Sequence, residues 1–307
     1  MSIPELKPIE GKYEILEKLN EGGMGAVYKV RHRLLEEVRV IKVIRPQLQS
    51  DENLRRRFLR EARAAVRLRH PNIAELYDFT VADDGTAYMV IEFIDGVDLI
   101  HLIEQSTLPS IRLILNIGVQ SLRALAYLHR KQFVHRDISP DNLMLTKDVE
   151  GETLVKLIDL GIAKPLKSEM NLTGEGFFLG KVRYASPEQF GGQSGKEEIE
   201  QRSDLYSLGI VLYEVLTGIH PITGDDNQTV LAGHLFHPPR TFAETDPQNR
   251  VPDGLRTIVM TALEKTADVR FPNAQAFSHD LATFAAQWVD DDYASAALDA
   301  TVIDAAP

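Results

Sequence analysis

The sequence predicts an α+β protein with two lobes: a small antiparallel β-sheet lobe with one helix, then a larger, mostly α-helical lobe. Segments rich in Val, Ile and Tyr, with apolar residues at alternate positions, dominate the chain up to Ile94. From Gly96 onwards, apolar residues recur at helical spacing. The chain has 307 residues, of which 44% are apolar, which is enough for a sizeable core. The expected divisions are residues 1–94, 95–288 and 289–307.

The first lobe is expected to contain five strands and one helix. The strand segments have apolar alternation or β-branched runs, and Asp83-Asp84-Gly85 marks the turn of a hairpin. The helix has apolar residues at helical spacing, can be capped by Ser50 or Asp51, and ends at His70-Pro71-Asn72. The expected strands are Tyr13 to Leu19, Ala26 to Arg31, Val38 to Ile44, Ile73 to Thr80 and Thr86 to Phe93, and the helix is Asn53 to Leu68.

The second lobe is expected to be helical, with one short pair of strands. The segment from Ser203 to Leu216 is apolar on nearly all sides, which predicts a buried helix, and Gly218 ends it. The residues after Trp288 are acidic and lack periodicity, so they predict a flexible tail or a linker. The other expected helices are Ile111 to Leu128, Arg256 to Leu263 and Ala274 to Trp288, and the strands are Leu143 to Leu145 and Leu154 to Ile158.

Composition and charge exclude several classes of function. The net charge of −11 argues against a general nucleic-acid binder, whose affinity depends on neutralising phosphates. The chain has no Cys, which removes disulfides and thiolate metal sites. It contains no apolar run of about 18 residues and no apolar signal core, so no membrane segment is expected in it. Arginines are concentrated over residues 55–69, which predicts a solvated helix face or, alternatively, a docking surface for a phosphorylated segment or an activating partner.

A loop in the second lobe combines the two side chains that phosphoryl transfer needs. The loop His135 to Asn142 places Asp137, which can accept a proton from a hydroxyl group, five residues before Asn142, which can ligate magnesium. Asp159 follows a predicted strand and precedes a glycine, which makes it a natural second ligand of the metal. These residues predict a site for a phosphorylated substrate and its metal ion.

A glycine-rich hairpin and a charged pair precede this loop in the chain. Glycines within Asn20 to Val27 let backbone amides approach phosphate oxygens. Lys42 lies in an apolar strand, where a lysine needs a partner, and Glu61 in the following helix can supply one. Alone, these features have ordinary explanations, as a turn, an edge lysine or a surface ion pair. Their order and spacing, however, make one set with the later loop.

In this order, the features resemble the eukaryotic-like Ser/Thr protein kinases from about Tyr13 to Trp288, and the run Ser186 to Gln189 is most similar to bacterial members. The resemblance implies the protein-kinase-like bilobal fold and the catalytic domain of a longer bacterial signalling protein. It implies transfer of the γ-phosphoryl group of ATP to Ser or Thr of protein substrates, including the kinase itself. It also implies magnesium, or manganese in its place, and a cytoplasmic location.

The resemblance also implies a role for each candidate residue. Asp137 is the catalytic base, Lys42 holds the α- and β-phosphates, Glu61 orients Lys42, and Asn142 and Asp159 hold the metal. The implied nucleotide contacts are the glycine-rich loop (Asn20, Gly22, Gly25), the adenine sandwich (Val27, Val40, Met144), the gatekeeper (Ile91), the hinge backbone (Glu92, Ile94) and the ribose (Asp98).

Further contacts are implied around the activation segment. Glu188, at the end of that segment, should pair with Arg270. Asp204 should hold the catalytic loop from the buried helix. Phosphorylation is expected at Thr173 in preference to Ser168.

Three positions depart from the family pattern. Asn20 stands where the first glycine of the glycine-rich loop is expected. Ser139 replaces a lysine that contacts the γ-phosphate, and Lys181 replaces a threonine of the substrate-docking loop that lies against that lysine. We interpret the last two changes as an exchange, in which Lys181 supplies the missing cation, because charge on the transferred group must be offset. The alternative is that Ser139 is tolerated and Lys181 is a solvated loop residue.

Two other functions are compatible with these residues. A pseudokinase scaffold is favoured by Asn20, Ser139 and Lys181 but opposed by the complete set of catalytic residues. A small-molecule kinase of the aminoglycoside phosphotransferase type would share the Asp–Asn pair, but would not need the peptide-docking platform from Asp159 to Glu188. In the tail, Thr301 to Asp304 resembles a phosphothreonine sequence bound by forkhead-associated domains.

Overall fold

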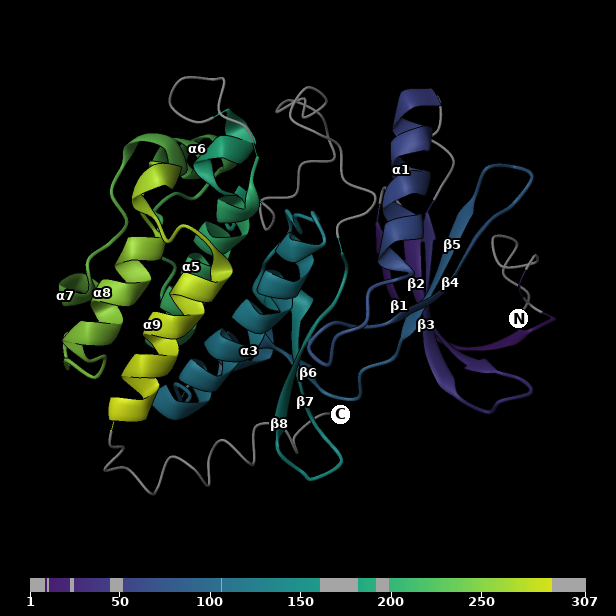
Figure 1. Ribbon diagram of the computed structural model, residues 1–307, viewed down its shortest axis with the longest axis horizontal. Helices are drawn as coiled ribbons and strands as arrows, with labels where there is room; N and C mark the ends of the chain where they lie inside the picture. Colours follow the sequence, from purple (N-terminus) through teal and green to yellow (C-terminus); the bar gives the residue numbers. More distant parts are fainter. Residues whose placement is uncertain are drawn as a thin grey trace. The chain divides into compact units, whose positions relative to one another are not determined.

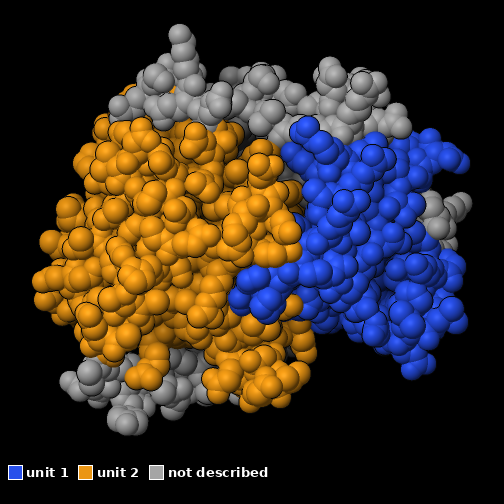
Figure 2. Space-filling model, viewed as in Figure 1, with its two compact units in different colours: residues 1–94, 162–166 blue, residues 95–161, 167–307 orange. Residues whose placement is uncertain are grey.

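The chain folds into two compact units, coloured blue and orange in Figure 2. The described residues up to Ile94 belong to unit 1, and those from Asp95 belong to unit 2. Unit 1 is an antiparallel sheet with one helix and unit 2 is mostly helical, which confirms the predicted fold class. The structure is a computed structural model that describes residues 9, 11–22, 25–44, 52–105, 107–160, 182–191 and 199–288, with the backbone alone over 52–58.

Unit 1 contains a five-stranded antiparallel sheet of order β1-β2-β3-β5-β4 (Figure 1). All five predicted strands are present, with β3 in the centre. The fourth strand begins at Leu76 rather than at Ile73, because the amide of Ile73 closes a turn onto the carbonyl of His70 around Pro71. The elements of unit 1 are β1 (Tyr13–Gly22), β2 (Gly25–His32), β3 (Val38–Ile44), α1 (Glu52–Ala65), β4 (Leu76–Val81) and β5 (Ala87–Glu92).

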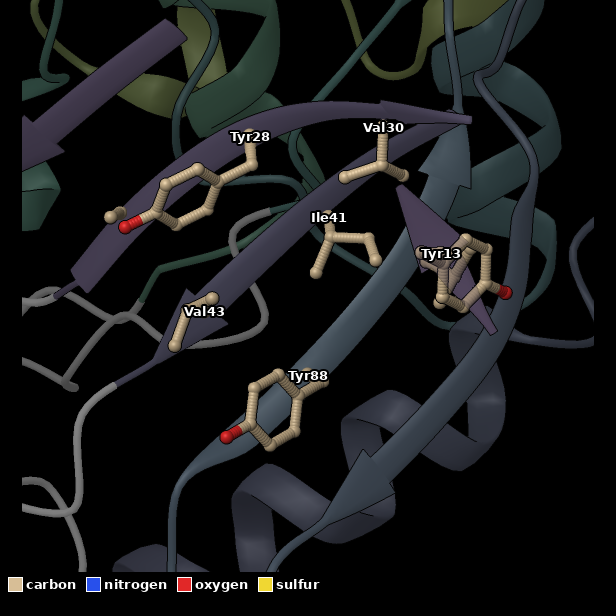
Figure 3. Close-up of a cluster of buried hydrophobic side chains, with 8 residues drawn as sticks. Tyr13, Tyr28, Val30, Ile41, Val43 and Tyr88 are labelled. Atoms are coloured by element: carbon tan, nitrogen blue, oxygen red, sulfur yellow. The ribbon is translucent and has the colours of Figure 1, made fainter. Parts of the chain in front are cut away.

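One face of this sheet forms the apolar core of unit 1. Side chains alternate between the two faces of a strand, so Tyr28 and Val30 of β2 lie on the same face as Ile41 and Val43 of β3. Figure 3 shows the tyrosine rings and branched side chains gathered in this cluster. The buried cluster consists of Tyr13, Ala26, Tyr28, Val30, Ile41, Val43, Tyr88 and Val90. On the opposite face, Val27, Val40, Lys42 and Ile91 are half-buried, so this part of the face is accessible to a ligand.

Unit 2 combines a helical array with a three-stranded antiparallel sheet of order β6-β7-β8 (Figure 1). Its four predicted helices and two predicted strands are all present. The sequence patterns do not predict β6, α2, α6 and α7. Of these, β6, α2 and α7 are too short to show a clear period. The elements are β6 (Val97–Asp98), α2 (Leu99–Glu104), α3 (Ile111–Arg130), β7 (Leu143–Lys147), β8 (Thr153–Leu157), α5 (Gln201–Thr217), α6 (Asn227–Phe236), α7 (Phe242–Thr245), α8 (Asp253–Ala262) and α9 (Ala274–Gln287), with 3-10 turns η3 (Pro140–Asn142), η5 (Pro187–Phe190) and η6 (Ala267–Val269).

Helix α5 forms the centre of unit 2. Every residue from Ser203 to Thr217 is buried, as predicted from its uniformly apolar sequence. Gly209 allows the close approach of α8, because a Cβ atom there would lie 2.9 Å from the side chain of Ala262. Gly218 ends the helix in the left-handed conformation, with φ 68°, and its amide donates to the Glu214 carbonyl, which confirms the predicted stop.

Helix α3 is long and apolar enough, by length and composition, to cross a membrane, and it is the only such helix among the described residues. Its most apolar window is 72% buried within unit 2, and it packs against α9 and α5. The apolar sequence of α3 is therefore accounted for by its place in the core of this unit.

Candidate active site

The loop that carries Asp137 is held from below by the buried carboxylate of Asp204 on α5. The backbone amides of His135 and Arg136 donate to Asp204 Oδ2 and Oδ1, at 2.9 and 2.8 Å. His129 Nε2 on α3 lies 2.8 Å from Oδ2. Burial alone would raise the pKa of Asp204, but the hydrogen bonds and charge from His129 and His135 hold the pKa below its usual value. The predicted anchoring of this loop by Asp204 is confirmed.

Two residues around the site have left-handed backbone conformations, which are uncommon outside glycine. Arg136 has φ 66° and Asp159 has φ 52°. Such conformations cost free energy and persist where surrounding bonds fix them, as Asp204 fixes Arg136. Such conformations concentrate at functional sites. Here, Arg136 immediately precedes the predicted base Asp137, and Asp159 is itself a predicted metal ligand.

Asp137 and Asn142, which were predicted to belong to one site, are in direct contact. The Asn142 side-chain nitrogen Nδ2 donates to Asp137 Oδ2 at 3.0 Å and to the Asp137 carbonyl at 2.8 Å. Both residues are buried, at 8% and 6% exposure. Because the nitrogen end of Asn142 is used in this way, its oxygen Oδ1 is the atom that can ligate a metal.

Ser139 also takes part in this arrangement. Its buried hydroxyl oxygen lies 3.2 Å from Asn142 Nδ2 and accepts a hydrogen bond from it. A lysine has no acceptor and could not make this bond. The serine therefore supports the side chain of Asn142, which gives the departure from the family pattern a structural role.

Asp159 is brought to Asn142 by the β7–β8 pair. Leu143 and Leu157 are register partners, and the amide of Ile158 donates to the carbonyl of Asn142 at 2.9 Å. Asn142 and Asp159 thus lie at neighbouring backbone positions, where each could supply one oxygen ligand. This set fits Mg²⁺, which is commonly held by one or two protein oxygens together with substrate phosphates and water. Within the described ranges, no cluster of three or more His, Asp or Glu side chains offers another metal site.

The predicted nucleotide-binding residues of unit 1 share one face of its sheet. Val27 pairs with Lys42, and Val40 pairs with Ile91, so these four side chains lie on the face opposite the buried cluster. All four are half-buried, whereas Ile41 between Val40 and Lys42 is fully buried. These four side chains place apolar groups next to the ammonium group of Lys42, which suits an adenine ring and its phosphates.

The glycine-rich hairpin is formed by β1 and β2, where Gly22 pairs with Gly25 and Asn20 pairs with Val27. A Cβ atom on Gly25 would lie 1.8 Å from the Val43 carbonyl, so glycine is required there by the close packing of β3. No heavy atom lies within 4 Å of a Cβ atom built on Gly22, so packing does not require glycine at that position.

The other predicted contacts are distributed over both units. Asp98 and Met144 are register partners in the small sheet of unit 2, and the Asp98 carboxylate also caps α2 by accepting from the amide of His101. In unit 1, the Glu92 carboxylate accepts from the amide of Glu75, and Ile94 is buried. Glu61 lies on α1 and is half-buried. The residues predicted at Lys181, Ser168, Thr173 and Thr301 lie outside the described residues.

The predicted pairing of Glu188 with Arg270 is confirmed. Arg270 Nη1 and Nη2 lie 2.8 and 3.0 Å from the two carboxylate oxygens of Glu188, and both side chains are almost fully buried. The Ser203 hydroxyl donates to the same carboxylate at 2.7 Å. This pair fastens η5, which follows the predicted substrate-docking loop, to the core of unit 2.

Sequence reasoning missed a second set of polar contacts under residues 182–190. The Tyr184 hydroxyl donates to Glu214 at 2.7 Å, and burial raises the pKa of this α5 carboxyl. His220 lies edge-on to the Tyr184 ring, and His234 lies beside the Phe190 ring. The one available signal was Glu214, a carboxylate within the apolar run of α5.

We expect the two buried histidines to make unit 2 sensitive to acid. Burial, followed by the charge of Arg183, lowers the pKa of His220 from 6.5 to about 4. Burial, followed by Lys265, lowers the pKa of His234 to about 3. Since the unfolded chain takes up these protons near pH 6.5 and the folded chain does not, stability present above pH 6.5 is lost as the pH falls towards 4.

The expected loss is about 1.4 kcal/mol per histidine for each pH unit below 6.5. Urea unfolding followed by the fluorescence of Trp288, the only Trp in the chain, measures it in unit 2. His220→Gln should flatten the pH dependence, and the same change at the exposed His279 should leave it unaltered. Equal pH dependence in the wild type and His220→Gln would contradict this expectation.

In unit 1, a half-buried group of side chains on one sheet face accompanies a glycine-rich hairpin. In unit 2, an acid and an amide share one loop, and a second acid follows β8. These features are those expected of an ATP-dependent phosphotransferase of the kinase fold. The family model described as "Protein kinase domain" matches residues 13–282. The chain belongs to this family, whose members use ATP and a divalent metal ion.

Curated bacterial relatives share this region. The chain is 35% identical over 278 residues to the Ser/Thr-protein kinase pkn3 of Myxococcus xanthus, which covers 90% of this chain and 50% of that protein. It is 36% identical over 278 residues to the Ser/Thr-protein kinase PrkC of Bacillus subtilis, covering 90% of this chain and 41% of the relative. The chain thus spans about half or less of the length of these relatives.

Solved structures agree with the fold. The kinase domain of PknI from Mycobacterium tuberculosis superposes with a TM-score of 0.65 at 26% identity, over 89% of this chain and 96% of that domain. The predicted membership of the bacterial eukaryotic-like Ser/Thr kinases is therefore confirmed.

Proposed function

We propose that this chain is a catalytic domain that transfers the γ-phosphoryl group of ATP to Ser or Thr residues of proteins, itself included. The observation that carries the proposal is the contact between Asn142 and Asp137, with Asp159 fixed next to them in a left-handed conformation. The names of the bacterial relatives, all Ser/Thr protein kinases, support the choice of a protein hydroxyl as acceptor.

Each residue then has one task in the transfer. The Asp137 carboxylate, oriented by Asn142, accepts the proton of the attacking hydroxyl group. Lys42 offsets phosphate charge from the half-buried sheet face, and Glu61 positions Lys42. Asn142 and Asp159 would hold Mg²⁺, or Mn²⁺ in its place, and the ion when bound neutralises charge on the phosphates.

The test is the transfer of label from ATP to protein. With the γ-phosphoryl group labelled, we expect label on Ser and Thr of the chain and of added protein substrates, and none with label in the α position. Nucleotide binding without any transfer would favour a pseudokinase scaffold. Transfer to small hydroxyl compounds without transfer to protein would favour a small-molecule kinase, the other alternative.

We further propose that Lys181 supplies the cation that Ser139 does not. Lys181→Ala should lower kcat by about 10²-fold, because charge on the transferred group is then left without one of its partners. The combination Ser139→Lys with Lys181→Thr should retain more activity than the sum of the two single losses predicts. An unchanged kcat in Lys181→Ala would contradict the hypothesis that Lys181 replaces the lysine missing at position 139. Lys147→Ala, at an exposed position of β7, is the matched control.

We propose that this domain is located in the cytoplasm, where ATP is plentiful.

We also propose that Thr301, once it is phosphorylated, is a docking site for a forkhead-associated domain. The support is the sequence Thr301-Val302-Ile303-Asp304. A phosphopeptide of residues 296–307 should retain a forkhead-associated domain, whereas the unphosphorylated peptide and one with Asp304→Ala should not. Equal retention by all three peptides would remove the proposal.

A further inference from the structure

Gln120 is a buried amide side chain in the long apolar helix α3 of unit 2. It is 8% exposed, and the proposed reaction gives it no task. Figure 1 shows α3 beside the small sheet of the same unit, and the helix packs against β8. An amide buried without hydrogen-bond partners is costly, so the partners of Gln120 indicate what its side chain does.

Strand β8 has one backbone edge outside the β-ladder. In the order β6-β7-β8 it is the last strand, so among the described strands it pairs only with β7. Backbone groups of successive residues point alternately to the two sides of a strand. The amide of Ile158 donates to Asn142 on the β7 side, which turns the backbone groups of Val155 and Thr153 to the other side. Val155 is fully buried, so its N–H group needs a partner within the protein.

The side chain of Gln120 supplies this partner. Its oxygen Oε1 accepts from the Val155 amide at 3.0 Å, and its nitrogen Nε2 donates to the Thr153 carbonyl at 2.8 Å. The same nitrogen donates to Asn116 Oδ1, one turn earlier on α3, at 3.0 Å. A backbone amide only donates and a carbonyl only accepts, so these contacts fix which way the Gln120 amide is turned. Gln120 thus binds β8 as the backbone of a neighbouring strand would.

The bonds from Gln120 act on the strand that leads to Asp159. Asp159 lies two positions beyond Leu157, the last residue of β8 (159 − 157). Between them, the amide of Ile158 donates to the carbonyl of Asn142 at 2.9 Å. Without Gln120, the strand would have to move to give its buried amide another partner. A ligand must be held within about 0.5 Å of its productive position, so such a movement would weaken a metal site.

We propose that Gln120 is a positioning residue, which acts through β8 to hold Asp159 beside Asn142 for metal binding. The inference rests on the proposed function, because that function assigns the metal ion to Asp159 and Asn142. Groups that orient the ligands from outside the coordination sphere tune metal sites in many proteins, and their loss weakens metal binding. Gln120 has this role at one remove, since it orients the strand and not the carboxylate itself.

The test measures metal binding instead of phosphoryl transfer. Mn²⁺ is added to the full chain together with an ATP analogue that cannot be cleaved, and the free ion is measured by electron paramagnetic resonance. Gln120→Met keeps the length of the side chain but removes its donor and its strong acceptor. We expect this variant to raise the apparent Kd for Mn²⁺ about tenfold, while the affinity for the analogue without metal stays within about twofold.

Two control variants separate positioning from a general loss of stability. Gln201→Met makes the same chemical change at the first residue of α5, where the side chain donates to the carbonyl of Pro272. Tyr213→Phe removes a hydroxyl group that donates to the carbonyl of Arg240 and contacts Thr245 Oγ1. The second control should lower the unfolding midpoint of unit 2. Both controls should leave the apparent Kd for Mn²⁺ unaltered.

Gln120→Glu is a second variant of the same shape, in case Gln120→Met does not fold. Its carboxylate accepts from Val155 but cannot donate to Thr153, so it should also raise the apparent Kd for Mn²⁺. An unchanged Kd in either folded variant would overturn the positioning role, and so would an equal rise in Tyr213→Phe.

Asp159→Asn distinguishes failure of this inference from failure of the proposed function. The neutral amide should bind Mn²⁺ more weakly than the carboxylate does. If Asp159→Asn leaves Mn²⁺ binding unchanged, the metal assignment is wrong, and the role of Gln120 is wrong with it. If Asp159→Asn weakens Mn²⁺ binding and the Gln120 variants do not, only the positioning role is wrong.

Discussion

The variant Asp137→Asn is expected to lose phosphoryl transfer while it keeps its fold and its affinity for nucleotide. An amide cannot accept the proton of a substrate hydroxyl group, and general base catalysis contributes about 10²- to 10⁴-fold to kcat. The substitution changes little in shape. Asn142 Nδ2 would still meet an oxygen at residue 137, and its bond to the backbone carbonyl is unaffected.

This expectation is measured as kcat with labelled ATP, alongside nucleotide affinity and the Trp288 unfolding curve. The matched control is Asp225→Asn, the same chemical change at an exposed residue of unit 2, which should leave kcat unaltered. Full activity in Asp137→Asn would exclude this residue as the base. Lost nucleotide binding or a lowered unfolding midpoint would mean that the carboxylate is structural.

The catalytic loop shows which parts of a site a sequence can predict. The spacing of Asp137 and Asn142 predicted that both belong to one site, and the family resemblance implied that Asp204 holds their loop, which the structure confirms for Asp204. The bond from Asn142 to Ser139 was not predictable, because it depends on which way the amide turns inside the folded loop. That bond shows that Ser139 has a structural role apart from any exchange with Lys181.

The regular elements followed from periodicity, whereas the short ones did not. The strands of unit 1 and the long helices α3, α5 and α9 each have enough residues for a period to appear. Helix α7 has four residues and is set by a capping box between Thr241 and Glu244. The contact of Tyr184 with Glu214 joins residues thirty positions apart, and no local pattern encodes it.

Arg270→Met is expected to lower the free energy of unfolding of unit 2 by about 3–5 kcal/mol, the usual cost of leaving one charge of a buried pair without its partner. All five N–H groups of Arg270 are used. Besides the two bonds to Glu188, they donate to the carbonyls of Glu264, Arg202 and Lys265. The guanidinium also lies 4.8 Å from the centre of the Tyr206 ring. Lysine cannot reproduce this fork, so Arg270→Lys should recover little.

Urea unfolding followed by Trp288 gives this free energy, because Trp288 stacks on Phe284 of α9 and reports on unit 2. Arg202→Met, which removes an exposed ion pair with Asp268, is the control and should cost at most about 1 kcal/mol. Burial alone would raise the pKa of Glu188, but Arg270 and Ser203 hold it below its usual value. The stabilisation is therefore present above the ordinary carboxyl pKa and is lost as the pH falls through the lowered value.

The double variant Arg270→Met with Glu188→Leu separates the cost of an unpaired Glu188 carboxylate from the cost of losing the bonds between Arg270 and backbone carbonyls. Replacing both members of a buried pair by apolar residues removes the unpaired carboxylate, so the double variant should be more stable than Arg270→Met alone. The carbonyls of Glu264, Arg202 and Lys265 would still lack their donor, so stability should not return to the wild-type value. If the double variant were no more stable than Arg270→Met, the cost would lie in those carbonyls. The pair with Glu188 would then fasten η5 without dominating the stability of unit 2.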